Sequence, residues 1–183
     1  MAMKLAKKLM MNFDELREKA MQIAEKVHSS QVDKGGKPYI GHPIRVERMC
    51  SRQEDRLVAL LHDTVEDGDI TSEYLLMAGF PQEVVDAVLS VSRKRGEDYL
   101  DFIQRCKTNP IGRRVKICDL RDNMDITRLN ELTEKDIERL KKYHKAYKIL
   151  NYCCPVNFQT AQESSPKPFR IGLRGFIFKK QAP

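Results

Sequence analysis

Apolar residues recur three and four positions apart through most of residues 12–150, which is the spacing of helices with one buried face. The first helix is predicted after Asn12, which can cap it with Glu15 as the capping-box partner. Its apolar face comprises Leu16, Ala20, Ile23, Ala24 and Val27. No segment of this region has the two-residue alternation of a strand. The pattern therefore predicts an all-α fold.

The remaining helices can be placed from caps, prolines and apolar spacing. We expect a short helix after Pro43, a helix over 54–66, a short one after Thr71, one that starts at Pro81, and others over 98–108, 110–118 and 137–150. Between residues 29 and 43 the period is interrupted by a polar, glycine-rich loop. Together these elements predict one helical bundle without internal repeats.

The two ends of the chain have a different composition. Residues 151–183 contain three prolines, a serine pair and a basic, aromatic segment without helical period. We expect an irregular, flexible tail there, with a docked arm or a short hairpin as the alternatives. The predicted organisation is a basic N-terminal segment over 1–11, a domain over 12–150 and the tail over 151–183.

Charge and composition limit the kinds of partner that this chain is expected to bind. The net charge of +7 divides into +3 for residues 1–11 and +4 for residues 151–183, which leaves the body of the protein neutral. A duplex-binding domain carries positive charge on its folded face, so nucleic acid is not expected as a partner. No apolar run is long enough to span a membrane, and the start does not resemble a secretory signal. Five scattered cysteines are typical of reduced thiols, and we expect a cytoplasmic protein.

A candidate for chemistry lies at the end of the predicted helix over 54–66. There the chain places an adjacent pair, His62 and Asp63, one turn before a second pair, Glu66 and Asp67. Such a cluster would repel itself unless a divalent cation, for which imidazole and carboxylate are good ligands, neutralised it. A solvated acidic helix end is the alternative on these residues alone.

Two further segments could supply ligands to the same ion. His42 stands in a rigid loop just before Pro43, and Asp119 ends the apolar segment over 115–118. Taken separately, His42 would more often cap a helix or fill a core than bind metal.

In this order the motifs resemble the HD superfamily of metal-dependent phosphohydrolases, and in particular the hydrolase domain of the RelA/SpoT family and its small stand-alone relatives. The resemblance covers about residues 20–150. It is carried by the segments His28-Ser-Ser-Gln31, Gly36-Lys37-Pro38-Tyr39-Ile40-Gly41-His42-Pro43, Ala59-Leu60-Leu61-His62-Asp63-Thr64-Val65-Glu66-Asp67, Val115-Lys116-Ile117-Cys118-Asp119-Leu120-Arg121-Asp122-Asn123 and Arg139-x-x-x-Tyr143.

The resemblance implies a metal site and a reaction. It assigns the metal, usually manganese, to His42, His62, Asp63 and Asp119. It also gives the acidic pair that orients or deprotonates water as Glu66 and Asp67. The first candidate reaction is removal of the 3′-pyrophosphate from guanosine 3′,5′-bis(diphosphate), with a small phosphorylated nucleotide as the only expected partner and a homo-oligomer left open. The synthetase half of long RelA/SpoT proteins is not expected in 183 residues.

The residues that contact substrate follow from the same resemblance. It points to Lys34, Asn123, Arg139 and Tyr143. The chain departs from the alarmone hydrolases at Asp33, where they usually carry the arginine of an Arg-Lys pair. A carboxylate there would repel a highly anionic nucleotide unless it turned away. Two alternatives therefore stay open: an HD hydrolase of another nucleotide or phosphate ester, and a metal-binding regulatory module without turnover.

Overall fold

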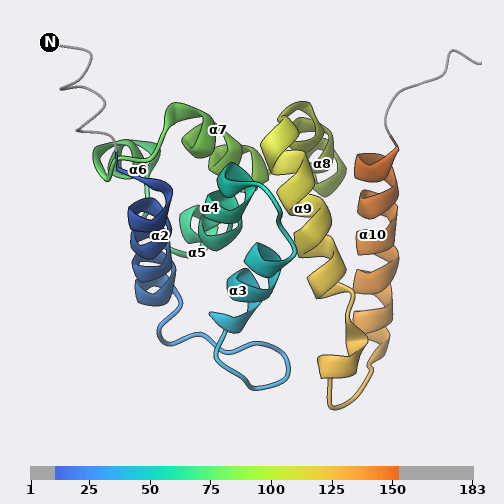
Figure 1. Ribbon diagram of the computed structural model, residues 1–183. Coiled ribbons are helices and arrows are strands. Elements are labelled where there is room, and N and C mark those ends of the chain that lie inside the picture. Colours follow the sequence, from blue (N-terminus) through green and yellow to red (C-terminus); the bar gives the residue numbers. More distant parts are fainter. Residues whose placement is uncertain (1–10, 153–183) are drawn as a thin grey trace, which may run out of the picture. The chain divides into compact units, whose positions relative to one another are not determined.

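The computed structural model describes residues 11–152, and all regular structure in this part of the chain is helical (Figure 1). The elements are α2 (Phe13–Val27), α3 (Gly41–Arg48), α4 (Gln53–Leu61), α5 (Thr64–Asp67), α6 (Ser72–Met77), α7 (Gln82–Val91), α8 (Tyr99–Thr108), α9 (Pro110–Asn123), the 3₁₀ turn η1 (Ile126–Arg128) and α10 (Glu134–Asn151). Val32 and Pro38 form an isolated antiparallel bridge within the loop between α2 and α3. The all-α prediction is confirmed. The expected tail from residue 153 on, and residues 1–10, lie outside the described residues.

The helix starts follow from local hydrogen bonds. The Asn12 side chain accepts from the backbone N–H of Glu15, whose carboxylate accepts in return from the N–H of Asn12, so the predicted capping box is present. Thr133 and Asp136 form the same reciprocal pair at the start of α10. Both boxes satisfy backbone donors that no helical carbonyl can reach.

Helices α4 and α9 are the centre of the bundle. Helix α4 packs on α2, α3, α7 and α9, and α9 also contacts α3, α7, α8 and α10. Because α4 is surrounded, its five residues from Leu57 to Leu61 are all buried, and each fully buried leucine contributes roughly 1.5–3 kcal/mol. The central position of these two helices matters because each carries residues of the candidate metal site. Among the described residues, no helix combines the length and apolar character required to cross a bilayer.

Buried ion pairs hold the central helices in register. Glu47 on α3 accepts from Arg17 on α2 at 2.5 Å and from Arg56 on α4 at 2.7 Å. The hydrogen bond from Arg17 is the main cause of the lowered pKa of Glu47. Asp55 on α4 accepts two bonds from Arg114 on α9, at 2.6 and 2.7 Å. These pairs fix α3, α4 and α9 relative to one another.

Four predicted helix boundaries are wrong, and three of them lie at the candidate site. The fourth is the start of α10, which begins at Glu134, three residues before the predicted start. The expected helix over 54–66 breaks at His62 and Asp63, so that α4 and a separate short α5 replace it. Helix α3 begins at Gly41 and not after Pro43, which puts His42 in a helical turn instead of a loop. Helix α9 continues past Cys118 to Asn123. The break between α4 and α5 is caused by tertiary packing of polar groups around the candidate site. Local helix propensity carries no information about that packing.

Candidate metal centre and adjoining pocket

Four side chains from three elements converge at one point. His42 comes from α3, the pair His62 and Asp63 from the end of α4, and Asp119 from the middle of α9. The Nε2 atoms of the two histidines are 3.2 Å apart. Asp119 Oδ1 lies 3.1 Å from Nε2 of His42 and 3.7 Å from Nε2 of His62. Asp63 Oδ2 lies 3.1 Å from Nε2 of His62 and 3.7 Å from Nε2 of His42.

These separations suit a small divalent cation. With metal–ligand bonds of about 2.1 Å, neighbouring ligand atoms are about 3.0 Å apart at right angles and about 3.4 Å apart at the tetrahedral angle. Three of the five distances, 3.1, 3.1 and 3.2 Å, fall in that range, and the other two, both 3.7 Å, lie slightly above it. His42, His62 and Asp119 are buried, and their ligand atoms lie close enough together to share one ion. Two imidazoles and two carboxylates also form a donor set typical of transition-metal sites.

The second nitrogen of each ring is already engaged. Nδ1 of His62 donates to the carbonyl oxygen of Ala59 at 2.7 Å, and Nδ1 of His42 donates to Oδ2 of Asp122 at 2.7 Å. Because neither acceptor carries a proton, both rings direct the Nε2 lone pair at the centre when they are neutral. Two lone pairs at 3.2 Å repel each other unless a cation lies between them. This outer-shell arrangement is the one that orients histidine ligands in metal sites.

The shifted pKa values in this cluster also show that its carboxylates favour a nearby positive charge. Burial lowers the pKa of His62, but the carboxylates of Asp63 and Asp119 outweigh burial and raise it well above 6.5. The pKa of Asp63 is lowered: burial opposes this, and the charge of His62 overcomes it. The pKa of Asp119 falls well below its ordinary value because Lys116 and the two histidines outweigh burial. In metal-free protein, the raised pKa of His62 therefore favours a proton where an ion would supply positive charge.

The candidate catalytic pair lies at the edge of this centre. Helix α5 carries both residues, and Glu66 accepts a hydrogen bond at 2.5 Å from the backbone N–H of Arg93 in the loop after α7. Asp67 Oδ2 lies 4.0 Å from Nδ1 of the buried His28. Burial, followed by the charge of Asp63, raises the pKa of Asp67; burial also raises the pKa of Glu66. A raised pKa brings a carboxylate closer to the range in which it accepts protons well at neutral pH.

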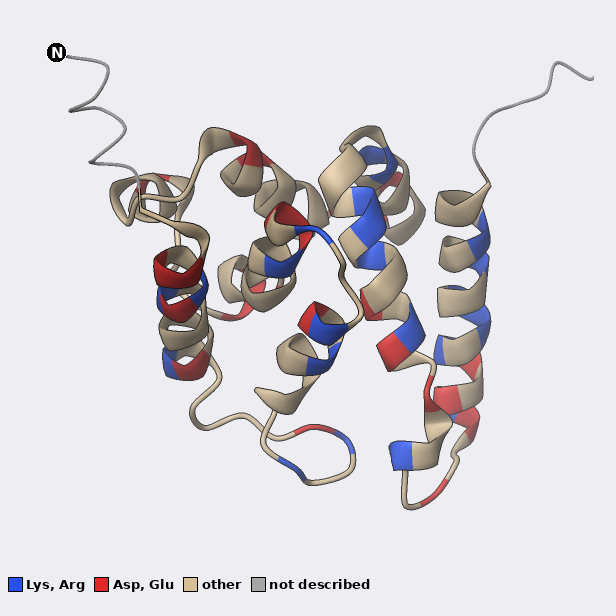
Figure 2. Ribbon diagram, viewed as in Figure 1, with Lys and Arg blue, Asp and Glu red and all other residues tan. Residues whose placement is uncertain are grey.

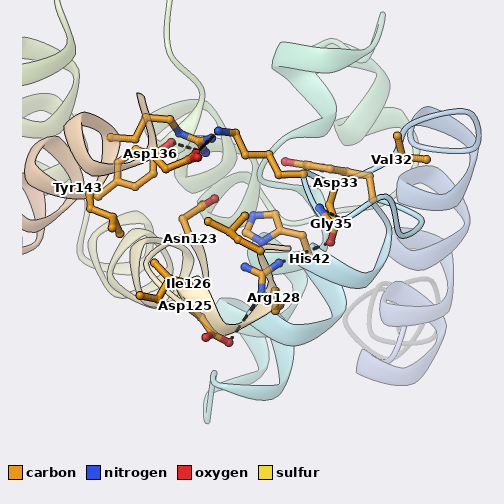
Figure 3. Close-up of a pocket in the computed structure, with 15 residues that line it drawn as sticks. Val32, Asp33, Gly35, His42, Asn123, Asp125, Ile126, Arg128, Asp136 and Tyr143 are labelled. Carbon is orange, nitrogen blue, oxygen red and sulfur yellow. Dashed lines mark hydrogen bonds and ion pairs between the residues drawn. The ribbon is translucent and has the colours of Figure 1, made fainter. Parts of the chain in front are cut away.

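A pocket of about 190 Å³ opens next to the metal centre (Figure 3). All four residues that were predicted to contact substrate line it: Lys34, Asn123, Arg139 and Tyr143. His42 also lines it, with Asp33 and Val32 on one side and Asp136, Tyr143 and Asn123 on the other. Two pairs of residues four positions apart each share one face of a helix. Asn123 donates to Oδ1 of Asp119 at 2.5 Å, and Arg139 donates to the Tyr143 hydroxyl at 3.2 Å.

Asp33 is restrained by its own loop. Its Oδ1 accepts from the backbone N–H groups of Gly35 and Lys37 at 2.9 and 3.0 Å. Its Oδ2 lies 3.6 Å from Nη1 of Arg128. The carboxylate therefore closes the loop and faces a guanidinium, which reduces the repulsion that the sequence suggested. Its negative charge nevertheless remains in the pocket lining.

Sequence reasoning assigned no role to several residues that support the site. The Tyr39 hydroxyl donates to Oδ2 of Asp63 at 2.6 Å, and Lys116 Nζ lies 2.8 Å from Oδ2 of Asp119. Asp122 accepts from His42 and also from Arg45 at 2.7 Å. Each of Tyr39, Lys116 and Asp122 stands three residues from a ligand, so helical or turn spacing was an available signal.

Arg128 is different because no sequence signal marked it. It follows α9 in the turn η1 and reaches back to Oδ2 of Asp122 at 3.2 Å. Of the other two histidines, His28 donates to Gln31 at 2.7 Å and buttresses the loop, while His144 is exposed on α10.

Part of the chain is similar in sequence to known enzymes. No model of a known protein family matches the chain. A probable GTP pyrophosphokinase of Mycobacterium leprae is 32% identical over 120 residues, covering 58% of this chain and 15% of that protein. A guanosine-3′,5′-bis(diphosphate) 3′-pyrophosphohydrolase of Aquifex aeolicus is 30% identical over 119 residues, covering 58% of this chain and 17% of that protein. The chain thus spans less than a fifth of the length of either relative.

A solved structure shares the fold. It is a metazoan orthologue of SpoT that hydrolyses ppGpp, and it superposes with a TM-score of 0.60 at 21% identity over 74% of this chain and 85% of its own. Over the matched stretches the chain is similar in sequence to these two enzymes, and its described residues share the fold of the solved structure. The tandem His62 and Asp63 lie at the break between α4 and α5. At this break both side chains face His42 of α3, and His62 also faces Asp119 of α9.

Proposed function

We propose that the chain contains an HD-type domain of the RelA/SpoT kind, and that this domain is a metal-dependent phosphohydrolase that removes pyrophosphate from the 3′ position of a guanosine polyphosphate, with manganese at His42, His62, Asp63 and Asp119. The observation that carries the proposal is the convergence of these four side chains beside a pocket large enough for part of a nucleotide. The relatives named 3′-pyrophosphohydrolase support the choice of reaction.

The chain supplies groups for each requirement of the reaction. A divalent cation bound at the centre supplies Lewis acidity toward the phosphate oxygens and makes water more acidic. Glu66 and Asp67 stand at the edge of the centre as proton acceptors, and burial has raised the pKa of both. Lys116 keeps its positive charge despite burial, because Asp119 raises its pKa, and it adds to the attraction for phosphate.

The pocket can bind the nucleotide from which the pyrophosphate is removed. Val32 and Ile126 are exposed apolar residues in its lining, and the aromatic ring of Tyr143 stands nearby. Asn123 links the pocket to the metal ligand Asp119. We assign Lys34, Asn123, Arg139 and Tyr143 to substrate contact because they share this lining.

A second candidate keeps the metal centre and changes the substrate. Asp33 favours it, because one carboxylate of the lining occupies a position that alarmone hydrolases fill with arginine. A third candidate is a regulatory module that binds metal without turnover. Such a module would not need the acidic pair on α5, so the presence of that pair favours a catalytic role.

A nucleotide panel separates these candidates. Purified protein is analysed for bound metals, stripped, reloaded with manganese and incubated with guanosine 3′,5′-bis(diphosphate) and other phosphorylated nucleotides, and the products are resolved by ion-exchange chromatography. The leading proposal expects guanosine 5′-diphosphate and pyrophosphate from the first substrate. Cleavage of other nucleotides alone supports the second candidate, and tight metal binding without any cleavage supports the third.

A matched pair of variants tests the acidic pair. Glu66→Gln should retain the metal and lower turnover by roughly 10²–10⁴-fold, as expected for loss of an acid–base group. Glu73→Gln changes an exposed glutamate on α6 and should leave turnover unaltered. Equal turnover in Glu66→Gln and wild type would refute the role of Glu66.

A further inference from the structure

The charges that line the pocket cancel. Its basic side chains are those of Lys34, Arg128 and Arg139, and its acidic ones those of Asp33, Asp125 and Asp136. Figure 2 shows the same mixture of signs on the two loops that precede α3 and α10. A pocket built for a second, highly charged diphosphate would present excess positive charge to it.

The first of these basic side chains, Lys34, is paired with a carboxylate that is itself fixed in place. Lys34 pairs with Oδ1 of Asp136, and Arg139 Nη1 lies 3.9 Å from the same oxygen. The other oxygen, Oδ2, caps α10 by accepting from the Thr133 hydroxyl at 2.5 Å. Because the helix cap anchors Asp136, a phosphate group that binds Lys34 must compete with a carboxylate that cannot move away.

A second basic side chain of the lining, Arg128, lies close to three carboxylates. Arg128 lies 3.2 Å from Oδ2 of Asp122, 3.6 Å from Oδ2 of Asp33 and 3.8 Å from Oδ2 of Asp125. Asp33 is anchored in turn by the backbone N–H groups of its own loop. Each basic side chain of the lining thus has a carboxylate within 4 Å before any nucleotide binds.

These contacts concern only the part of a nucleotide that lies outside the metal centre. The scissile 3′-diphosphate would be served by the cation and by Lys116, which sits on the far side of Asp119 and does not line the pocket. The 5′ substituent would meet the charge-balanced lining. Because the charges of the lining cancel, each additional negative charge there loses part of its hydration without a net Coulomb attraction in return.

We propose that the site discriminates among nucleoside 3′-diphosphates by the charge of the 5′ substituent, preferring a 5′-hydroxyl or 5′-monophosphate to a 5′-diphosphate, and that Asp33 and Asp136 set this preference. The inference rests on the proposed function and refines its substrate class. Guanosine 3′,5′-bis(diphosphate) remains a substrate, but a less efficient one than its counterparts with fewer phosphates at the 5′ position.

The test compares three substrates that differ only at that position: guanosine 3′-diphosphate with a 5′-hydroxyl, a 5′-monophosphate or a 5′-diphosphate. In wild type, kcat/KM should rise by roughly 3- to 10-fold for each charge removed, the size of one charge–charge interaction over several ångströms at the dielectric constant of water. The preference should weaken as salt is added, because screening acts on partly exposed charges.

Isosteric variants connect the preference to the two carboxylates. Asp33→Asn keeps an oxygen for the N–H groups of Gly35 and Lys37, and Asp136→Asn keeps one for Thr133, so each variant removes charge and little else. Each should raise kcat/KM for the 5′-diphosphate substrate by roughly 3- to 10-fold relative to the 5′-hydroxyl substrate. Asp86→Asn, on an exposed position of α7 outside the lining, should leave that ratio unchanged.

A binding measurement decides the inference even without turnover. Calorimetric titration of the manganese-loaded protein with guanosine, guanosine 5′-monophosphate and guanosine 5′-diphosphate should give decreasing affinity in that order, and the order should flatten in both variants. If wild type favours the 5′-diphosphate in binding or in kcat/KM, or if Asp33→Asn and Asp136→Asn leave the ratios as they were, the inference is wrong. Absence of all cleavage with the expected binding order would instead refute the proposed function alone.

Discussion

Asp122 links the candidate metal ligand His42 to the rest of the protein, and its replacement by asparagine tests whether this link matters. The side chain is 6% exposed and accepts from Nδ1 of His42 at 2.7 Å. It also accepts from Nε and Nη2 of Arg45 at 2.7 and 3.1 Å and from Arg128 at 3.2 Å. Although burial opposes it, hydrogen bonds from His42 and Arg45 lower the pKa of Asp122 to about 2. Asparagine keeps the shape and removes the charge.

Two effects of Asp122→Asn can be sized. Loss of an outer-shell carboxylate from a histidine ligand typically lowers metal affinity about 10- to 100-fold, or roughly 1.4–2.8 kcal/mol, because the ring becomes less basic and less well oriented. The folded protein should also lose about 1–3 kcal/mol, the cost of leaving charged donors without a full partner. We expect a value near the lower end, since Arg45 and Arg128 are 32% and 25% exposed and water can replace part of the interaction.

Manganese titration of metal-free protein by calorimetry measures the first effect, and urea unfolding followed by circular dichroism measures the second. Asp125→Asn is the matched control, because its carboxylate is 44% exposed and reaches Arg128 only at 3.8 Å. The control should bind manganese within about twofold of wild type, as expected for an exposed pair. If folded Asp122→Asn protein bound manganese as tightly as wild type, the assignment of Asp122 as the group that orients His42 would be refuted.

Three further predictions concern pH, an outer-shell tyrosine and the core. Because the carboxylates of Asp63 and Asp119 outweigh burial and raise the pKa of His62 well above 6.5, its proton stabilises the metal-free fold below pH 6.5, and this stability is lost as pH rises through the folded pKa. Thermal melts of metal-free protein should therefore fall in Tm from pH 6.5 upward, and saturating manganese should remove the trend; a flat metal-free profile would contradict it. Tyr39→Phe removes the donor 2.6 Å from Oδ2 of Asp63 and should weaken manganese binding about 10-fold in calorimetric titration without loss of fold, whereas unchanged binding would deny Tyr39 a role. Leu60→Ala opens a cavity at a residue that is 0% exposed and should cost about 2–5 kcal/mol in urea unfolding; a cost well below this range would mean that α4 repacks.

The residues of the site were visible in the sequence because each kind of chemistry restricts the residue types. The tandem His62 and Asp63, followed by an acidic pair, suggested a cation site through charge repulsion, with a solvated acidic helix end as the alternative, and the resemblance to the HD superfamily favoured the cation site. The spacing of Asp119 and Asn123 placed both on one helix face, and the structure agrees. The capping box of Asn12 and Glu15 also placed the start of α2 before any packing was considered.

The boundaries at the site could not be obtained in this way. The apolar run before His62 and the acidic residues after it read as one helix, yet the chain breaks there. Nothing local requires the break. It allows the His62 ring to donate to the carbonyl of Ala59 while Nε2 faces ligands from α3 and α9, and those ligands lie 20 and 57 positions away in the chain. The periodicity of apolar residues carries no information about interactions between residues so far apart in the chain.

By itself, then, the sequence determined the helical class and helix caps such as Asn12, because apolar period and backbone capping are local properties, and through the family resemblance it named four candidate metal ligands. The tertiary structure decided which groups hold those ligands in place, Tyr39, Lys116 and Asp122 among them. It also decided that Arg128 and Asp136 balance the charge of the pocket. These outcomes depend on Coulomb and hydrogen-bond contacts between distant segments, which exist only after the helices have packed.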